Sequence, residues 1–219
     1  SSDLHADVAS MLNVTLADIE LGEKLGEGAS GIIYQGRWLN PAMVAATGCE
    51  HIAVKLFKGE VTSDGYPADE LDCCLTTGAH PNLIKVLAHI SQQDQLGLVM
   101  ELIPQGFSNL GLPPSLASCT RDTFKAGTEF SLKGITEIAL QLADTLAHMH
   151  GKQVSHGDVY AHNMMVNQQM ALLFGDFGAA SNLAKLPTSE RDAMQAIEVR
   201  ALGCLLDDLL PFADNDEDD

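Results

Sequence analysis

The chain has 219 residues, of which 46% are hydrophobic, and its 30 acidic and 12 basic residues give a formal net charge of −18. The charge disfavours a nucleic-acid partner, because binding phosphates needs clustered Lys and Arg, and the basic residues here are scattered singly. No apolar run is long enough to span a membrane, so no membrane span is expected.

The five cysteines are odd in number and form no CxxC pair. This pattern excludes a zinc-ribbon framework and a secreted disulfide scaffold, so we expect a reducing, cytoplasmic location. The chain starts at Ser1 without a methionine and without a signal-peptide pattern. We interpret it as a domain of a longer protein or as a processed chain.

The N-terminal half, residues 1–103, is predicted to be one β-rich lobe. An amphipathic lead-in over residues 1–14 precedes short apolar runs that are typical of strands. One helix is expected at Ala68–Thr77. The expected strands are Ile19–Leu25, Ile32–Trp38, Ile52–Phe57, Leu83–Ile90 and Leu96–Leu102.

The C-terminal half, residues 104–219, is predicted to be helix-rich, which makes the chain α+β. Gly106–Lys133 is rich in Gly, Pro, Ser and Thr and is expected to be an irregular connection whose length indicates a function. An acidic, disordered tail is expected after residue 213. The regular elements expected here are helices at Ile135–His150 and Ser189–Leu210 and short apolar runs at Met164–Val166 and Ala171–Phe174.

Two motifs in the first half suit phosphate binding. Gly26, Gly28 and Gly31 have GxGxxG spacing between two expected strands, so the backbone of the hairpin can lie close over phosphates. A dinucleotide-binding turn would lead into a helix instead. Lys55 follows Ile52-Ala53-Val54, and a lysine among apolar neighbours needs phosphates or a carboxylate as partner. Taken singly, an empty hairpin and a solvent-facing edge lysine are the alternatives.

Further motifs follow in a fixed order. They are His-Pro-Asn at 80–82, His-Gly-Asp at 156–158 with an asparagine at 163, and Asp-Phe-Gly at 176–178. With the glycine loop and the lysine strand, this order over residues 19–210 resembles the eukaryotic-type protein kinase family. The resemblance implies a two-lobed α+β fold with a β-rich N-lobe and a shortened, helical C-lobe. It also implies transfer of the γ-phosphate of Mg-ATP to a protein hydroxyl.

The resemblance assigns catalytic and metal-binding roles. Asp158 would accept the proton of the acceptor hydroxyl, and Asn163 and Asp176 would hold Mg²⁺ through oxygen ligands, which this hard cation prefers. Lys55 would hold the α- and β-phosphates and pair with Glu70. Asp69 and Asp72 are the neighbouring alternatives for that carboxylate.

The resemblance also assigns the remaining nucleotide contacts. Gly26, Gly28 and Gly31 would cover the phosphates. Met100 would be the residue next to the adenine pocket, followed by adenine hydrogen bonds from the backbones of Glu101 and Ile103. Three side chains would sandwich the adenine ring: Ile33, Ala53 and Met165.

The chain departs from the family in its second half. Gly157 replaces the usual arginine before the catalytic aspartate, so we expect activity without activation-loop phosphorylation. Tyr160 stands where serine/threonine kinases have lysine, while tyrosine kinases would have arginine at Tyr160 or His162; we expect the serine/threonine type. Glu198 falls where the family braces the catalytic loop with an aspartate, and the later substrate-binding helices are absent after Leu210.

Two other functions stay open at this stage. His-Gly-Asp with a spaced asparagine also resembles the aminoglycoside and choline phosphotransferases, which act on small molecules. Tyr160 and the short C-lobe suit a pseudokinase that binds nucleotide and acts as a binding module. In addition, Pro114–Asp122 together with the His-Gly-Asp segment resembles the kinase domains of bacterial leucine-rich-repeat kinases, which implies such repeats elsewhere in the parent chain.

Overall fold

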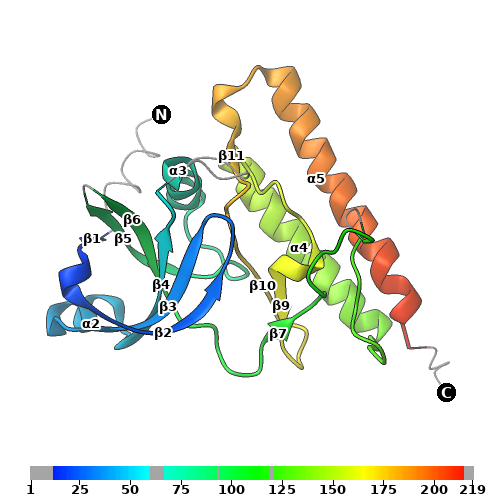
Figure 1. Cartoon of the computed structure of the whole chain (residues 1–219). Coiled ribbons are helices and arrows are strands. Elements are labelled where there is room, and N and C mark those ends of the chain that lie inside the picture. Colours follow the sequence, from blue (N-terminus) through cyan, green and yellow to red (C-terminus); the bar gives the residue numbers. More distant parts are fainter. Residues whose placement is uncertain (1–11, 60–66, 93, 119–120, 215–219) are drawn as a thin grey trace. The chain divides into compact units, whose positions relative to one another are not determined.

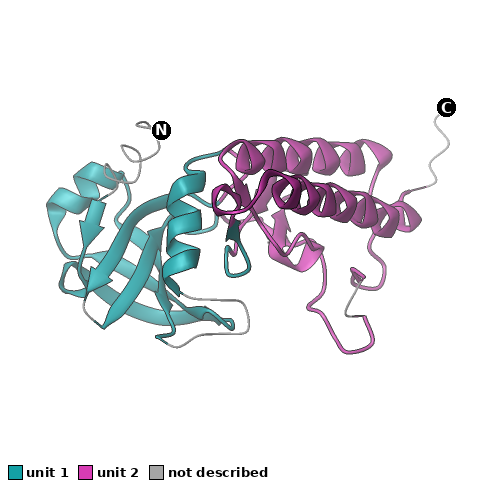
Figure 2. Ribbon diagram, turned by 90° about the horizontal axis from the view of Figure 1, so that it is seen from above, with its two compact units in different colours: residues 1–80, 84–103, 177–181 teal, residues 81–83, 104–176, 182–219 magenta. Residues whose placement is uncertain are grey.

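The structure is a computed structural model that describes residues 12–59, 67–92, 94–118 and 121–214. It divides into two compact units, coloured separately in Figure 2. Unit 1 comprises Ser1–His80, Ile84–Ile103 and Phe177–Ser181, and unit 2 comprises Pro81–Leu83, Pro104–Asp176 and Asn182–Asp219. We describe each unit by itself.

Unit 1 is built on a six-stranded sheet with the order β1-β5-β6-β4-β3-β2. All neighbouring strands are antiparallel except β1 and β5, which run parallel. The blue-to-green strands of Figure 1 show this sheet. Its strands are β1 (Leu12–Val14), β2 (Ile19–Glu27), β3 (Gly31–Trp38), β4 (His51–Phe57), β5 (Val86–Gln92) and β6 (Gln95–Met100).

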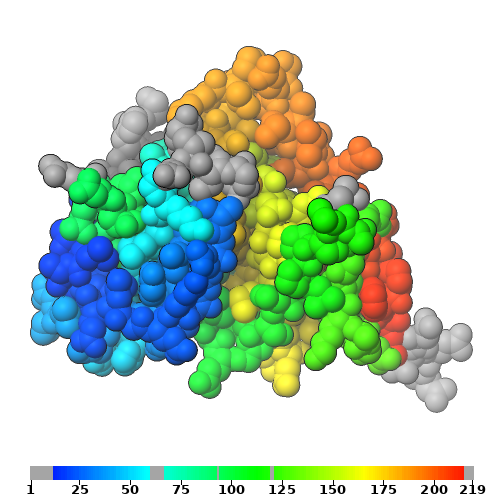
Figure 3. All heavy atoms as spheres, viewed as in Figure 1, coloured from blue at the N-terminus to red at the C-terminus, as the bar shows by residue number. Residues whose placement is uncertain are grey.

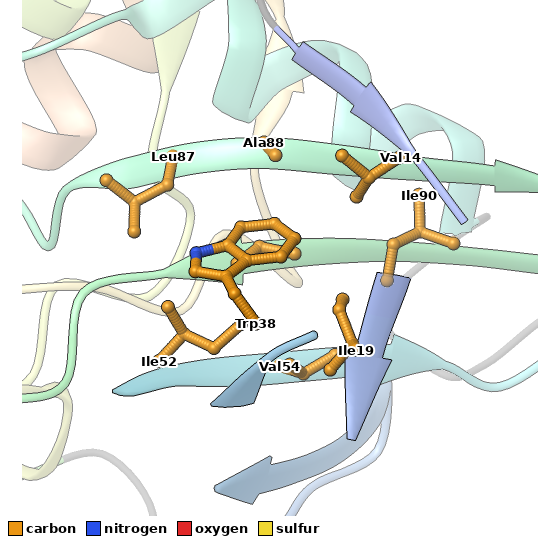
Figure 4. Close-up of a cluster of buried hydrophobic side chains, with 9 residues drawn as sticks. Val14, Ile19, Trp38, Ile52, Val54, Leu87, Ala88 and Ile90 are labelled. Carbon is orange, nitrogen blue, oxygen red and sulfur yellow. The ribbon is translucent and has the colours of Figure 1, made fainter. Parts of the chain in front are cut away.

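A hydrophobic cluster on this sheet surrounds Trp38, whose residue surface is only 2% exposed (Figure 4). The indole bridges strands that are far apart in sequence, which explains how one aromatic side chain can fix the sheet's packing. Its buried partners are Val14, Ile19, Ile52, Val54, Leu87, Ala88, Ile90 and Val99.

Two helices belong to unit 1. α2 (Pro41–Thr47) begins at Asn40, whose side chain accepts a hydrogen bond from Ala42 N, and ends at Gly48 with φ +74°. The sequence analysis missed this helix, although Asn-Pro at its start and Gly at its end are helix signals. α3 (Pro67–Thr77) confirms the helix expected at Ala68–Thr77.

The beginning of the chain corrects one expectation. Leu12–Val14 was assigned to a lead-in before the first strand, but it forms β1 and pairs with β5. Val14 is 3% exposed and packs in the Trp38 cluster, so burial of this side chain explains the strand. The rest of the lead-in, residues 1–11, and residues 215–219 of the acidic tail lie outside the described residues.

Two strand boundaries also differ from the expectation. The strand expected at Leu83–Ile90 begins at Val86, because Leu83 instead forms an isolated bridge with Phe174 in unit 2. The strand expected at Leu96–Leu102 ends at Met100.

Unit 2 is organised by two long helices, which lie side by side in Figure 1. α4 (Leu132–Gly151) begins at Ser131, whose Oγ accepts a hydrogen bond from Gly134 N at 2.9 Å. This cap explains why α4 starts three residues before the expected Ile135. α5 (Thr188–Leu209) matches the helix expected at Ser189–Leu210 within one residue at each end.

Short elements precede, connect and follow the two helices. β7 (Ser108–Asn109), β9 (Met164–Val166) and β10 (Leu172–Phe174) form a sheet in the order β10-β9-β7. β8 is Val154–Ser155 and β11 is Ser181–Asn182, and the 3₁₀ helices of unit 2 are η2 (Ala161–Asn163), η3 (Leu183–Lys185) and η4 (Leu210–Phe212). The connection expected to be irregular at Gly106–Lys133 has β7 as its only strand among the described residues.

The irregular connection is nevertheless anchored at its end. Phe124 makes edge-to-face contacts with Phe130 and Phe212, at centroid distances of 6.3 and 5.1 Å. Phe130 N donates to Phe212 O at 2.8 Å. Both Phe124 and Phe130 are 8% exposed, so this aromatic cluster holds the chain before α4 against the end of α5.

Candidate active site

The glycine loop is the hairpin between β2 and β3 in unit 1. Gly28 N donates to Gly31 O at 2.9 Å, which closes the turn. A Cβ on Gly31 would lie 2.5 Å from Leu56 O, so this glycine is required by the close approach of β4. A Cβ on Gly26 or Gly28 would meet nothing within 4 Å. These two glycines therefore keep a surface of the loop open instead of filling a packing need.

Glu27 braces the same loop through two lysines. Its carboxylate forms ion pairs with Lys24 and, at 3.2 Å, with Lys58. Hydrogen bonds from the Lys24 and Lys58 side chains hold the pKa of Glu27 below its usual value, with Lys24 the larger influence. The three side chains are exposed, so the pairs fix the shape of the hairpin more than they stabilise the fold.

Lys55 on β4 forms a direct ion pair with Glu70 on α3. The two side chains are 9% and 3% exposed, and the Lys55 ammonium also lies 5.4 Å from the ring centroid of Phe57. Glu70, and not the neighbouring Asp69 or Asp72, is thus the carboxylate on Lys55. Removing one partner of such a buried pair leaves a costly unpaired charge.

The remaining predicted residues of unit 1 lie on or after neighbouring strands. Ile33 is opposite Lys55 in the β3–β4 register, and Ala53 is opposite Met100 in the β4–β6 register. Glu101 N donates to Lys85 O at 3.0 Å, so its carbonyl is the backbone group that suits an adenine hydrogen bond. Ile103, 40% exposed, is the last residue of this segment of unit 1.

The catalytic loop of unit 2, His156–Asn163, is held at its start by Glu198 of α5. The Glu198 carboxylate accepts hydrogen bonds from His156 N at 3.0 Å and Gly157 N at 2.8 Å, and Oε1 lies 2.8 Å from His150 Nε2. Burial raises the pKa of Glu198, but these hydrogen bonds outweigh it and the pKa lies below its usual value. The bracing role expected for Glu198 is confirmed.

His156 is a buried, neutral imidazole. Nε2 donates to Gly175 O at 2.8 Å, while Nδ1 accepts from Asp158 N at 3.2 Å, and this pattern requires the neutral ring. Burial lowers the pKa of His156. The ring also stacks on Phe174 at 4.0 Å. The His156 ring therefore joins the backbone of Gly175 to the backbone of Asp158.

Asp158 and Asn163 are brought together within the catalytic loop. Asn163 Nδ2 donates to Asp158 Oδ2 at 2.6 Å and to Asp158 O at 3.0 Å. Because Nδ2 donates to Asp158, the amide oxygen Oδ1 of Asn163 is the atom of this side chain that can bind a cation. His162 Nε2 lies 3.6 Å from Asp158 Oδ2, and its ring stacks on Tyr160 with a centroid distance of 5.7 Å.

Asp176 and Met165 complete the predicted residues of unit 2. Asp176 has φ +58°, a left-handed conformation that Asp tolerates better than most residues. Met165 lies on β9, opposite Leu173 of β10 and Asn109 of β7.

A cavity of about 180 Å³ lies beside Asp158. The sequence analysis missed several of the residues that shape this side of unit 2. Asp122 and Leu112 line the cavity from the irregular connection, together with Tyr160 and His162 from the catalytic loop. The Pro114–Asp122 resemblance assigned no contact to Asp122, and the neighbours of Asp122 and Leu112 in space are distant in sequence.

Asn82 is a second residue whose role was missed. Its side chain donates to Gln141 Oε1 at 2.9 Å and to Leu172 O at 3.0 Å, and its carbonyl accepts from Phe174 N. The His-Pro-Asn turn therefore ties α4 to β10 within unit 2. This structural task explains why an asparagine suits the position.

The predicted residues thus fall into two half-sites. Unit 1 contains the glycine loop, the buried lysine–glutamate pair and the strands and backbone expected at the adenine. Unit 2 contains the catalytic loop and the residues expected to hold a metal. A β-rich lobe, a helical lobe and these two half-sites together define a protein-kinase-like fold.

Comparison with known proteins identifies the family. The family model described as "Protein tyrosine and serine/threonine kinase" matches residues 19–208, and the chain belongs to this family. The chain is 29% identical to Aurora/IPL1-related protein kinase 2 of Caenorhabditis elegans, over 82% of this chain and 53% of that relative. It is 27% identical to tyrosine-protein kinase Fer of Rattus norvegicus, over 74% of this chain and 17% of the relative.

A third relative is the probable serine/threonine-protein kinase roco5 of Dictyostelium discoideum, 29% identical over 80% of this chain and 6% of the relative. The chain therefore spans about half or less of the length of these curated relatives. Within residues 12–59, 67–92, 94–118 and 121–214, no helix has both the length and the apolar character needed to cross a membrane.

Proposed function

We propose that the chain is an ATP- and Mg²⁺-dependent protein kinase of the serine/threonine type. The observation that carries this proposal is the pair formed by Asp158 and Asn163, with Asn163 Nδ2 on Asp158 Oδ2 at 2.6 Å. The pair fixes the carboxylate that would act on the acceptor hydroxyl and points the amide oxygen away for a metal. Family membership and the Lys55–Glu70 ion pair support it.

In this proposal unit 1 holds the nucleotide. The backbone around Gly26, Gly28 and Gly31 covers the phosphates, and Lys55, oriented by Glu70, contacts the α- and β-phosphates. The adenine ring would lie between apolar side chains and hydrogen-bond to backbone groups. The residues proposed for the adenine are Ile33, Ala53, Met100, Glu101, Ile103 and, from unit 2, Met165.

Unit 2 acts on the acceptor. Asp158 accepts the proton of the acceptor hydroxyl. At the same time the hydroxyl oxygen bonds to the γ-phosphorus, and the bond between that phosphorus and the ADP oxygen breaks. Its orientation is supported by His156, whose neutral ring accepts from Asp158 N, and by Glu198, which holds the start of the loop. The cavity beside Asp158 is the proposed place for the acceptor side chain.

Asn163 and Asp176 are the residues that would hold Mg²⁺. A carboxylate and an amide oxygen fit this hard cation. The Nδ2 of Asn163 is already engaged with Asp158, which leaves the amide's oxygen for a cation. Bound Mg²⁺ supplies neutralisation of phosphate charge.

Independence from activation-loop phosphorylation rests on Gly157. Its φ is +83°, a left-handed conformation that costs an L side chain about 1–2 kcal/mol. Gly157 N also donates to Glu198. Position 157 therefore has no arginine to bind a phosphate on the activation loop, and Glu198 holds the catalytic loop instead. Phosphatase treatment is expected to leave activity unchanged, and abolished activity would contradict this part of the proposal.

The serine/threonine type is proposed because neither Tyr160 nor His162 is the arginine typical of tyrosine kinases. We also propose a cytoplasmic location, from the cysteine pattern, and leucine-rich repeats elsewhere in the parent chain, from the Pro114–Asp122 resemblance.

The test is transfer from γ-labelled ATP with Mg²⁺, to the chain itself and to a mixed serine, threonine and tyrosine peptide library, followed by phosphoamino-acid analysis. We expect phosphoserine or phosphothreonine with the wild type and none with Asp158→Ala. Transfer only to a small hydroxylated compound such as an aminoglycoside would overturn the protein-kinase proposal. Nucleotide binding without any transfer would indicate a pseudokinase.

A further inference from the structure

The irregular connection before α4 forms hydrogen bonds with both backbone polar groups of Ala161 in the catalytic loop. Gly111 N donates to Ala161 O at 3.1 Å, and Asp122 Oδ1 accepts a hydrogen bond from Ala161 N at 2.7 Å. Figure 3 shows the green connection packed against the yellow atoms of the catalytic-loop region within unit 2. Both polar backbone groups of Ala161 thus have partners from a segment about 40–50 positions earlier in the chain.

Gly111 brings the two segments unusually close. A Cβ at this position would lie 2.6 Å from the Cβ of Ala161 and 3.2 Å from His162 N. Only glycine permits this approach without moving the catalytic loop. Leu112 N also donates to Thr123 O at 2.8 Å, which ties the residues after Gly111 to those after Asp122. The two contacts on Ala161 therefore belong to one closed loop.

Asp122 is itself fixed to α5. Asp122 N donates to Asp208 Oδ2 at 3.0 Å, and the Arg121 guanidinium binds Asp208 Oδ1, with Nε at 2.8 Å. The Asp208 side chain is 10% exposed. The carboxylate of Asp122 is thus aimed at Ala161 by a chain of hydrogen bonds that starts on a long helix.

Ala161 is the first residue of η2, which ends at Asn163. Asn163 in turn holds Asp158 through its Nδ2. A displacement at Ala161 would therefore move the amide that orients the catalytic carboxylate. We propose that Asp122 is a positioning residue for phosphoryl transfer, which sets the geometry of Asp158 and Asn163 through the backbone of Ala161. This inference rests on the proposed kinase function.

Most of the surroundings of Asp122 disfavour its ionised form. Burial raises its pKa, the hydrogen bond from Ala161 lowers it, and the negative charges of Asp208 and Asp158 raise it again, for a net upward direction. The hydrogen bond from Ala161 N opposes these influences and favours the ionised carboxylate. A hydrogen bond to a charged acceptor is about twice as strong as a neutral one.

The test compares three variants of this chain with the wild type. Asp122→Ala removes the acceptor, Asp122→Asn keeps an oxygen that can accept from Ala161 N, and Asp207→Asn removes an equal charge from a neighbouring exposed position of α5. Three quantities are measured: kcat for transfer from ATP, KM for ATP, and hydrogen exchange at the Ala161 amide. Gly111→Ala serves as a second perturbation of the same contact.

We expect Asp122→Ala to lower kcat about 10- to 100-fold with KM for ATP changed less than about 3-fold. Exchange at Ala161 should become at least about 10-fold faster. Asp122→Asn should recover most of the loss, Gly111→Ala should lower kcat, and Asp207→Asn should match the wild type.

Equal kcat in Asp122→Ala and the wild type would overturn the proposal, as would a loss seen equally in kcat and KM for ATP. Wild-type chain that transfers no phosphate would refute the kinase function. In that case unchanged exchange at Ala161 in Asp122→Ala refutes the positioning contact, while faster exchange supports it independently of activity.

Discussion

The two half-sites differ in how closely they follow the kinase family. In unit 1 the lysine and glutamate expected from the family form a buried pair, with side chains 9% and 3% exposed. In unit 2 the Asp158 side chain is 37% exposed, and its loop has Gly157 and Tyr160 where the family has cations. The nucleotide role proposed for unit 1 thus follows from family resemblance, whereas the acceptor role proposed for unit 2 rests on the geometry of its own residues.

A second contrast concerns how each half is held. Lys55 and Glu70 lie on a strand and a helix with a packed core around them. The catalytic loop is instead held by single carboxylates, Glu198 at its start and Asp122 near its end. We therefore expect the largest loss of stability at the buried pair of unit 1 and the largest loss of activity at Asp158 of unit 2.

The largest expected effect is at Asp158. Asp158→Asn should lower transfer about 10²- to 10⁴-fold, because the amide cannot accept the hydroxyl proton. Initial rates of transfer from labelled ATP measure the loss. Asp192→Asn, an exposed position of α5, is the control and should keep the wild-type rate. Undiminished transfer by Asp158→Asn would exclude it as the proton acceptor.

The next largest effect concerns stability in unit 1. Lys55→Met should lower the free energy of unfolding by about 3–5 kcal/mol, because Glu70 is left buried without its cation. The double variant Lys55→Met with Glu70→Met should recover most of this loss, since two apolar groups replace the pair. Urea denaturation measures both. If the double variant is less stable than Lys55→Met, the account of this pair is wrong.

Glu198→Gln should be less damaging, at about 1.5–3 kcal/mol. The new amide group would face backbone N–H donors of His156 and Gly157 in place of a carboxylate oxygen. Thermal unfolding checks the loss, and Glu190→Gln, exposed in the first turn of α5, is the matched control. Equal stability of the two variants would argue against the brace.

The glycine loop gives a matched pair of substitutions. Gly31→Ala should cost about 1–3 kcal/mol of stability, because the new Cβ overlaps Leu56 O. Gly26→Ala has open space and should stay within about 0.5 kcal/mol of the wild type. Chemical denaturation compares them, and a larger loss for Gly26→Ala would reverse the packing argument.

The smallest effect is a pH dependence of stability. Burial lowers the pKa of both His156 and His89. The unfolded chain binds these protons below about pH 6.5 while the folded chain does not. Lowering the pH below that value therefore lowers the stability, by up to about 1.4 kcal/mol per pH unit for each group. The lowered pKa of Glu198 extends the loss below about pH 4.5. Denaturation midpoints from about pH 7.5 to about pH 4 measure the slope. If His156→Gln leaves the slope between about pH 7 and 5 unchanged, His156 does not contribute to it.

Much of the molecule followed from local signals. The structure confirms the expected positions of the strands around the glycine loop and Lys55, and those of the two long helices. These elements could be predicted because apolar periodicity and helix caps act within a few residues. β1 was missed because a three-residue strand is defined by its pairing with β5, which lies far along the chain. Asp122 was missed for the same reason, since its partner Ala161 is 39 residues away.

Some residue contacts were predicted from the order of the kinase motifs and not from hydrophobic periodicity or helix signals. The family resemblance identified Glu198 as the brace of the catalytic loop and Glu70 as the partner of Lys55, and the structure confirms both contacts. The resemblance did not predict the contacts of Gly111 and Asp122 with Ala161, because it assigned no role to either residue.

The most direct test of the central claim compares Mg-ATP affinity in Lys55→Met and Asp158→Asn by calorimetric titration of the full chain. If unit 1 holds the nucleotide and unit 2 acts on the acceptor, Lys55→Met should weaken binding at least about 10-fold, roughly the loss of one charge-assisted contact. Asp158→Asn should bind within about 3-fold of the wild type while it loses transfer. Equal weakening of Mg-ATP binding in both variants, or none in Lys55→Met, would contradict this division of roles.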